Sequence, residues 1–340
     1  MNMLRKNQKY NFEKIVFQFY STILICLITL IHGCGSYNTE NNTKDKNTTV
    51  VNSDNQSAKN VRLISHALGE TPVPANPQRV VVLDTDRLDA SLALGIQPVG
   101  AVANPAEGFA GYLGNQTEGI TIVGSRKQPN IETILRLKPD LIMGNAREHR
   151  SIYNRLKQIA PTVLTEGRGT EGNWQELFQK DAQVLGKTET AEKLLSKYNQ
   201  RVSELKEKLS EKYQGKKISV ITLAQDRLGV FTNTSFPGSI LTNVGLEIPE
   251  SQKSNNEIIK QISREKLESI DSDIIFLLYF KTTGTSLSLE KFKNDALFSQ
   301  LKAVKQNQVY EVDGRVWITG SSIQAANGVL DDLSRYLLSP

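Results

Sequence analysis

Arginine and aromatic side chains follow several apolar runs of this chain, at places where a strand is expected to end. Arg147 comes after the apolar residues 141–144, and Tyr279 comes after the run 273–278. A guanidinium offers parallel donors to oxygen acceptors, and an aromatic ring offers a flat apolar wall with one polar edge. Side chains of these types at strand ends are candidates for contacts to a ligand. The candidate contacts are Arg126 and Arg147 in the first half and Arg227, Tyr279 and Trp317 in the second, with Thr85, Asp86, Lys127 and Phe231 as secondary candidates.

Each candidate also has an ordinary structural explanation. A loop arginine is often solvated, and a tryptophan is highly buried on average. Trp317 is therefore equally suited to anchor a core beneath the last helix, and Phe231 and Phe236 fit a core better than a ligand surface.

Motifs of catalysis are absent from the sequence. It contains no Gly-x-Ser-x-Gly elbow, no complete phosphate-binding loop of the form Gly-x-x-x-x-Gly-Lys-Ser/Thr and no His-Glu-x-x-His zinc helix. The glycine-rich residues 167–172 lack the spacing of a dinucleotide site and are interpreted as a surface loop. Beyond the N-terminal segment only His66 and His149 remain, too few for a zinc or manganese site, and each is interpreted as a surface or capped residue. We therefore expect a binding protein without enzymatic activity, metal ligands or a resident cofactor.

Short apolar runs alternate with helix-sized stretches over most of the chain. This alternation predicts βαβ units and mainly parallel sheets. Strands are predicted at residues 79–83, 98–102, 139–143, 162–164, 218–223, 273–278 and 308–312, and helices at 88–94, 130–137, 151–159, 238–244, 263–269 and 324–338.

One longer helix separates two groups of strands. Residues 188–213 contain no Gly or Pro, and one apolar stripe recurs every three or four residues at Leu194, Tyr198, Val202, Leu205 and Leu209. A helix of this length extends roughly 35–40 Å. The predicted fold class is α/β, with two lobes (60–186 and 215–340) joined by one long backbone helix (187–214) and the ligand between them. A single domain with a long surface helix is the alternative.

The first 33 residues have the pattern of a secretory signal. Residues 1–14 carry four Lys or Arg and one Glu, and the apolar run 15–31 leads to His32, Gly33 and Cys34. A cysteine after a small residue resembles the bacterial lipobox, which implies that Cys34 becomes the lipidated N-terminus. An uncleaved anchor helix is the alternative, since the run is at the lower edge of what spans a bilayer. The polar residues 34–59 would then form a disordered tether.

The charge balance follows from this segment. The chain has 41 Lys+Arg and 36 Asp+Glu, a net charge of +5. Residues 1–14 account for +3 of it, so cleavage leaves +2 on the mature chain. So small a charge does not favour nucleic-acid binding.

Residues 61–338 resemble the substrate-binding proteins of ABC importers whose two lobes are joined by a rigid helix, and among these the iron–siderophore branch. The order and spacing of several short blocks carry the resemblance over the whole globular part. The blocks are NPQRVVVL (76–83), ALGIQPVG (93–100), VGSRKQPNIE (123–132), LKPDLI (137–142), SFPGSIL (235–241), SRE (263–265) and LDDL (330–333).

The resemblance implies a ferric siderophore as ligand, of hydroxamate or citrate–hydroxamate type. The siderophore already fills the coordination positions of its iron, so the protein needs no metal ligands. Many hydroxamate and citrate binders carry an arginine near the positions 222–224; this chain has none there, and Arg227 is the candidate replacement. Haem and cobalamin receptors of the same fold remain alternatives, as does a lipoprotein adaptor without a transport role.

The resemblance also implies that one acidic residue on each lobe contacts basic residues of the permease. The matching residues are Glu132 and Glu265, which follow the expected helix caps Asn130 and Ser263. A favourable interaction with the helix dipole is the alternative explanation. The implied partners are a ferric siderophore, an ABC permease and the membrane through the lipid, but no nucleic acid. The protein is expected to be monomeric and extracytoplasmic, in the periplasmic space or at the cell surface, with small lobe closure.

Overall fold

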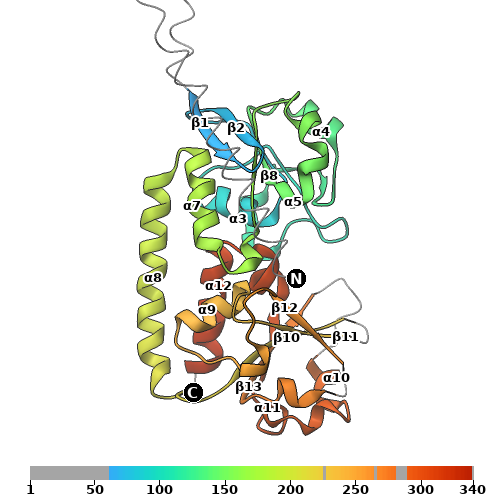
Figure 1. Ribbon diagram of the computed structural model, residues 1–340, viewed down its shortest axis with the longest axis vertical. Helices are drawn as coiled ribbons and strands as arrows, with labels where there is room; N and C mark the ends of the chain where they lie inside the picture. Colours follow the sequence, from blue (N-terminus) through green and yellow to red (C-terminus); the bar gives the residue numbers. More distant parts are fainter. Residues whose placement is uncertain (1–60, 225–226, 264–265, 281–288, 339–340) are drawn as a thin grey trace, which may run out of the picture. The chain divides into compact units, whose positions relative to one another are not determined.

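The computed structural model describes residues 61–338 except 225–226, 264–265 and 281–288 (Figure 1). The predicted signal, Cys34 and the predicted tether lie outside these residues, as does Glu265. Of the helices in the described ranges, none is both long enough and apolar enough to cross a bilayer.

The first lobe is built on a parallel sheet. Its described part has five strands in the order β5-β4-β3-β8-β9, paired in parallel throughout. The central strands β3 and β8 are buried along their whole length, as expected of apolar runs covered on both faces. All carboxyl ends therefore meet at one edge. The strands are β3 (Val80–Val82), β4 (Gly100–Ala101), β5 (Thr121–Ile122), β8 (Leu141–Asn145) and β9 (Thr162–Thr165).

Helices pack around this sheet, and two antiparallel hairpins accompany it (Figure 1). The predicted helix 151–159 is instead a 3₁₀ turn followed by one short helix, and α7 and the first hairpin were not predicted. The elements are the hairpins β1 (Val61–His66)–β2 (Gly69–Pro74) and β6 (Gly124–Ser125)–β7 (Gln128–Pro129), the helices α3 (Thr85–Ala93), α4 (Ile131–Arg136), α5 (Ala146–His149), α6 (Tyr153–Leu156) and α7 (Trp174–Leu185), and the 3₁₀ turns η1 (Gly111–Thr117), η2 (Arg150–Ile152) and η3 (Gly169–Glu171).

The second lobe has a mixed sheet, while the strand pairings of the two lobe sheets together are mainly parallel, as predicted. The order of the mixed sheet in the described residues is β12-β11-β10-β13-β14, with β10–β11 and β11–β12 antiparallel and the other two pairs parallel. Ala224 pairs with Arg227, so only two residues connect β10 to β11, and a parallel crossover needs a dozen or more. The strands are β10 (Ile218–Ala224), β11 (Arg227–Phe231), β12 (Ile259–Ile262), β13 (Ile274–Tyr279) and β14 (Val309–Asp313).

Short helices and turns complete the second lobe. Where a helix was expected at 263–269, the described residues form the 3₁₀ turn η5 (Leu267–Ile270). The others are α9 (Phe236–Asn243), α10 (Leu289–Asn294), α11 (Lys302–Lys305), the closing helix α12 (Ile323–Leu338), the 3₁₀ turns η4 (Glu250–Gln252) and η6 (Phe298–Gln300), and the π-helical turn η7 (Arg315–Gly320).

A single helix, α8 (Thr188–Ser210), connects the lobes and packs against α7 and α12 (Figure 1). The predicted apolar stripe is confirmed, because Tyr198, Leu205 and Leu209 are buried and Leu194 and Val202 pack against the same core. At 1.5 Å per residue the helix is about 35 Å long.

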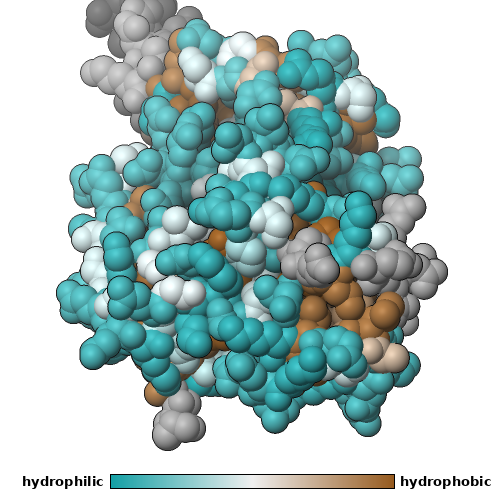
Figure 2. All heavy atoms as spheres, turned by 60° about the horizontal axis from the view of Figure 1, so that its bottom comes forward, coloured by the Kyte–Doolittle hydropathy of each residue, from teal (hydrophilic) through white to brown (hydrophobic). Residues whose placement is uncertain are grey.

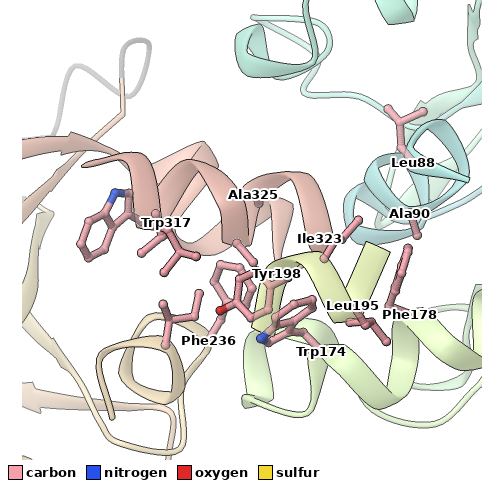
Figure 3. Packing of buried hydrophobic residues seen from close by; sticks show 14 of the residues in the cluster. Leu88, Ala90, Trp174, Phe178, Leu195, Tyr198, Phe236, Trp317, Ile323 and Ala325 are labelled. Carbon is pink, nitrogen blue, oxygen red and sulfur yellow. The ribbon is translucent and has the colours of Figure 1, made fainter. Parts of the chain in front are cut away.

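The main core is shared by both lobes. Near its centre the Trp174 ring meets the ring of Tyr198 edge-on at 4.9 Å and that of Phe236 at 6.0 Å (Figure 3). Side chains from both sheets, such as Val80 and Phe276, belong to the same cluster. Such close packing resists sliding of one lobe on the other. Hydrophilic side chains dominate the face in Figure 2, with the largest apolar area at the lower right and smaller ones towards the top.

The glycine-rich residues 167–172 lie where the lobes meet, so their interpretation as a surface loop is wrong. A Cβ on Gly169 would collide with the carbonyl oxygen of Ser321, and one on Gly172 would lie 2.6 Å from that of Thr234. Gly172 also has φ +76°, which favours glycine. These glycines permit close backbone contact between the lobes.

Candidate functional site

A cavity of about 190 Å³ lies between the lobes, near the carboxyl ends of strands from both sheets. Thr85 of its wall begins α3 directly after β3, and Phe280 follows β13. This is where α/β proteins usually bind ligands. Most of the wall is apolar or aromatic. The lining residues are Thr85, Leu88, Val102, Ala103, Asn104, Glu107, Gly108, Phe109, Ala110, Tyr112 and Leu113 of the first lobe and Phe280, Arg315, Thr319 and Gly320 of the second.

Polar contacts across the lobes hold the cavity wall in place. The Thr85 hydroxyl donates to the carbonyl oxygen of Thr319 at 2.6 Å. The Tyr112 hydroxyl donates to the Asp89 carboxylate at 2.8 Å. That carboxylate also accepts the backbone N–H groups of Gln324 and Ala325, at 2.9 Å each. Burial raises the pKa of Asp89 to about 7, although these donors oppose the shift.

One ion pair spans the cavity. Arg315 Nη1 of the second lobe donates to Glu107 Oε2 of the first at 2.9 Å. The side chain of Glu107 is 7% exposed and that of Arg315 20%. Arg315 also donates its backbone N–H to Asp313 Oδ1 at 2.8 Å. The cavity therefore contains one guanidinium within an otherwise mainly apolar wall.

Two arginines lie at the carboxyl edge of the first sheet. Arg126 follows the short strand β6, Arg168 follows β9, and each has a nitrogen 3.9 Å from Glu148 Oε1. His149 is fully buried rather than at the surface, which corrects the interpretation from sequence. Its Nδ1 accepts the N–H of Asn145 and its Nε2 lies 3.0 Å from the carbonyl oxygen of Arg126. This pairing fits a neutral ring protonated at Nε2, and burial lowers the pKa of His149.

Behind these arginines lies a buried network of charges. Arg87 Nη1 is 3.2 Å from Asp86 Oδ1 and 3.3 Å from Asp84 Oδ2, and its Nε is 3.7 Å from Asp181 Oδ1. Burial and the neighbouring Asp86 raise the pKa of Asp84 to about 7, and burial raises that of Asp181 to about 7. Asp86 Oδ2 also accepts the N–H of Gly169, so the network supports the junction of the lobes.

The predicted contacts of the first lobe are distributed over this edge. Arg126 is half-buried beside Arg168, whereas the Arg147 side chain is 71% exposed and pairs with Glu171 at 3.2 Å. Thr85 lines the cavity, Asp86 is buried in the charge network, and Lys127 is exposed on the β6–β7 turn.

Trp317, Phe231 and Tyr279, predicted contacts of the second lobe, do not line the cavity. Trp317 is completely buried, stacks on Phe276 at 4.7 Å and donates its indole N–H to Asp332, so it serves as the core anchor and does not face the ligand. Phe231 also belongs to the core. Tyr279 is half-buried at the end of β13 but is not part of the cavity wall. Arg227 begins β11, and its side chain lies outside the described part.

The residues of the site that the sequence analysis did not find include Glu107, Tyr112, Arg168 and Arg315. A signal existed for the two arginines. Arg315 comes two residues after β14 and Arg168 three residues after β9, the same relation that singled out Arg147 and Tyr279. Nothing in the local sequence pairs Glu107 with Arg315 or Tyr112 with Asp89.

The predicted docking residue Glu132 lies in the first turn of α4. The Asn130 side chain accepts the N–H of Thr133 at 2.9 Å and so caps the helix, as expected. The predicted partner Glu265 is outside the described residues.

Known proteins share this architecture. The family model described as periplasmic binding protein matches residues 80–316. The probable siderophore-binding lipoprotein YfiY of Bacillus subtilis is 36% identical over 294 residues, which cover 83% of this chain and 89% of that protein. The Fe(3+)-citrate-binding protein YfmC of Bacillus subtilis is 32% identical and covers 92% of this chain and 93% of its own length.

Solved structures agree with the fold. Staphylococcus aureus SirA, in its crystal structure with staphyloferrin B, has a TM-score of 0.72 and 28% identity, over 82% of this chain and 98% of that one. The predicted α/β fold of two lobes joined by a helix is thereby confirmed, with the second sheet mixed. The chain belongs to the periplasmic binding protein family, whose members bind ligands and are not enzymes.

Proposed function

We propose that this protein is an extracytoplasmic receptor that binds a ferric siderophore between its lobes and delivers it to an ABC importer. The observation that carries the proposal is the cavity between the lobes, with Arg315 in its wall and Arg126 and Arg168 at the same edge of the first sheet. Aromatic walls and forked donors suit an iron complex whose outer atoms are rings and oxygens. The descriptions of two relatives support it, since YfiY is a probable siderophore-binding lipoprotein and YfmC an Fe(3+)-citrate-binding protein.

The size of the cavity indicates how the ligand lies. At about 190 Å³ it is smaller than the roughly 300–1,000 Å³ of typical ligand pockets. We therefore propose that one arm of the complex enters the cavity and that the rest lies towards Arg126, Arg168 and the exposed Arg147. Hydroxamate or citrate–hydroxamate ligands are favoured because both present the oxygens that these arginines bind, and Arg227 and Tyr279 remain candidate contacts from the second lobe.

The proposed delivery rests on two further features. Glu132 is exposed at the start of α4, where it is accessible to basic residues of a permease, and Glu265 is its proposed counterpart on the second lobe. Lipidation at Cys34 would keep the receptor near the permease. We expect Cys34→Ala to release the protein from the membrane fraction, and retention there would favour the uncleaved helix.

Binding is tested by thermal shift of the full chain in detergent. The panel is ferric citrate, a ferric trihydroxamate, a ferric catecholate, haem and cobalamin. A ligand present at 100 times its Kd should stabilise the fold by about 2.7 kcal/mol. Stabilisation by an iron complex alone supports the proposal, whereas stabilisation by haem or cobalamin alone, or by nothing in the panel, contradicts it.

A further inference from the structure

The Glu107–Arg315 pair differs from a simple surface ion pair because it connects the two lobes. Glu107 belongs to the loop between β4 and η1 in the first lobe, and Arg315 begins η7 in the second, so the bond joins the lobes across the ligand cavity that both residues line. Both side chains are largely withdrawn from solvent. The cavity guanidinium is thus already matched by a carboxylate from the protein itself.

Arg315 has donors left over for a second oxygen ligand. A guanidinium carries five N–H groups. Among the described residues its Nε has no hydrogen-bond partner, and the nearest carboxylate oxygen, Asp313 Oδ1, is 3.7 Å away. On the other side, Nη2 faces Gly111, where a Cβ would lie 3.5 Å from it, so no side chain covers that nitrogen from this position. The N–H donors of the Arg315 guanidinium are therefore only partly used.

The apolar wall makes the charge of an entering group important. Leu88, Phe109 and Phe280 line the same cavity as the pair and lower its polarity. A neutral group that separated Arg315 from Glu107 would leave both charges desolvated and unpaired, which is strongly unfavourable. An anionic carboxylate of the ligand can instead pair with the Arg315 guanidinium, so that the Glu107 side chain moves into solvent.

We propose that Glu107 is an internal counter-ion that competes with a free carboxylate of the ligand for Arg315, and that only a ligand bearing such a carboxylate replaces it there. The inference rests on the proposed function and narrows it: the arm of the ferric complex that enters the cavity ends in a carboxylate. Glu107 thereby lowers the affinity for ligands that bind Arg315 through a carboxylate and has little effect on ligands that do not.

A purely structural role predicts the opposite sign. If the pair only holds the lobes together, weakening it favours separated lobes and reduces the affinity for all ligands alike. Competition predicts that weakening the pair increases the affinity for carboxylate ligands and leaves the affinity for other ligands nearly unchanged. The two roles are therefore distinguishable by one set of binding measurements.

The experiment measures the Kd of ferric citrate and of a neutral ferric trihydroxamate by calorimetry with the full chain in detergent. Glu107→Gln keeps the shape of the side chain and removes its charge. Glu118→Gln, an exposed residue of the same lobe outside the cavity wall, is the matched control. We expect Glu107→Gln to lower the Kd of ferric citrate at least about fivefold and to change that of the trihydroxamate by less than about twofold. Glu118→Gln should change neither.

Arg315→Lys provides the second test, since it keeps the charge and loses the fork. It should raise the Kd of ferric citrate at least about fivefold with little effect on the trihydroxamate. An equal loss of affinity for both ligands in Glu107→Gln, or no change in either, overturns the proposed competition. Wild-type protein that binds only the trihydroxamate also overturns it while leaving the receptor function intact. Absence of binding to either, with no thermal shift across the wider panel, overturns the receptor function itself.

Discussion

The Tyr112 hydroxyl donates to the Asp89 carboxylate at 2.8 Å, and through this bond the cavity wall is connected to the helix that closes the fold. Asp89 belongs to α3 of the first lobe, yet it accepts the backbone N–H groups of Gln324 and Ala325 in the first turn of α12. A carboxylate at a helix N-terminus satisfies donors that the helix itself leaves free. A side chain from one lobe thus caps a helix of the other.

Removing this cap should destabilise the protein. We expect Asp89→Ala to lower the free energy of unfolding by about 3 kcal/mol, because buried N–H donors lose a charged acceptor. Tyr112→Phe removes one bond and should cost about 1 kcal/mol. Urea unfolding measures both, with Glu118→Ala as an exposed control. A loss no larger for Asp89→Ala than for the control would contradict the role of the cap.

The same residue should affect how stability depends on pH. Burial raises the pKa of Asp89 in the folded protein to about 7, above its ordinary value of 3.8. The folded state then binds more protons than the unfolded state between these values, so this contribution to stability is present below about pH 4 and is lost as the pH rises through about 7. We expect Asp89→Asn to reduce the loss of stability between about pH 5 and pH 7. If the free energy of unfolding changed by the same amount between the two pH values in wild type and variant, the raised pKa would be contradicted.

Substitution of the arginines should separate ligand contacts from surface charges. Arg126→Ala and Arg168→Ala should each raise the Kd of the bound ferric complex about tenfold, since a charge-assisted hydrogen bond contributes about 1.5–3 kcal/mol. Arg147→Ala should have a smaller effect because its side chain is largely exposed. Arg150→Ala, an exposed arginine paired with Glu166, is the control. Calorimetric titration measures the Kd of the ferric complex for each variant. Equal effects in all four variants would contradict the proposed contacts of Arg126 and Arg168 with the ligand.

The proposed docking residues should act on uptake and not on binding. We expect Glu132→Ala combined with Glu265→Ala to leave the Kd of the ferric complex unchanged and to reduce cellular uptake of radioactive iron several-fold. Glu118→Ala with Glu290→Ala, exposed acids elsewhere on the chain, controls for the loss of two negative charges. Undiminished uptake in the double variant would show that docking depends on other residues.

Local sequence determined the regular elements of this protein. The apolar run of β13 extends over a few residues, and the apolar stripe of α8 over a few helical turns. Each pattern shows which side chains have to be buried, so each predicts its element without knowledge of the rest of the chain. The cap at Asn130 and the carboxyl-end rule that found Arg147 are similarly local.

Tertiary structure alone decided which side chains meet. Glu107 and Arg315 are 208 positions apart, and Asp89 and Ala325 are 236 apart. Whether Trp317 faces ligand or core depends on Phe276 and Asp332, and whether residues 167–172 are exposed depends on Ser321 and Thr234. Such pairings arise from the closure of one lobe on the other, a long-range arrangement that no short pattern encodes. The elements and the edge that carries the site were therefore readable from sequence, whereas the ion pair across the cavity and the cap between the lobes were not.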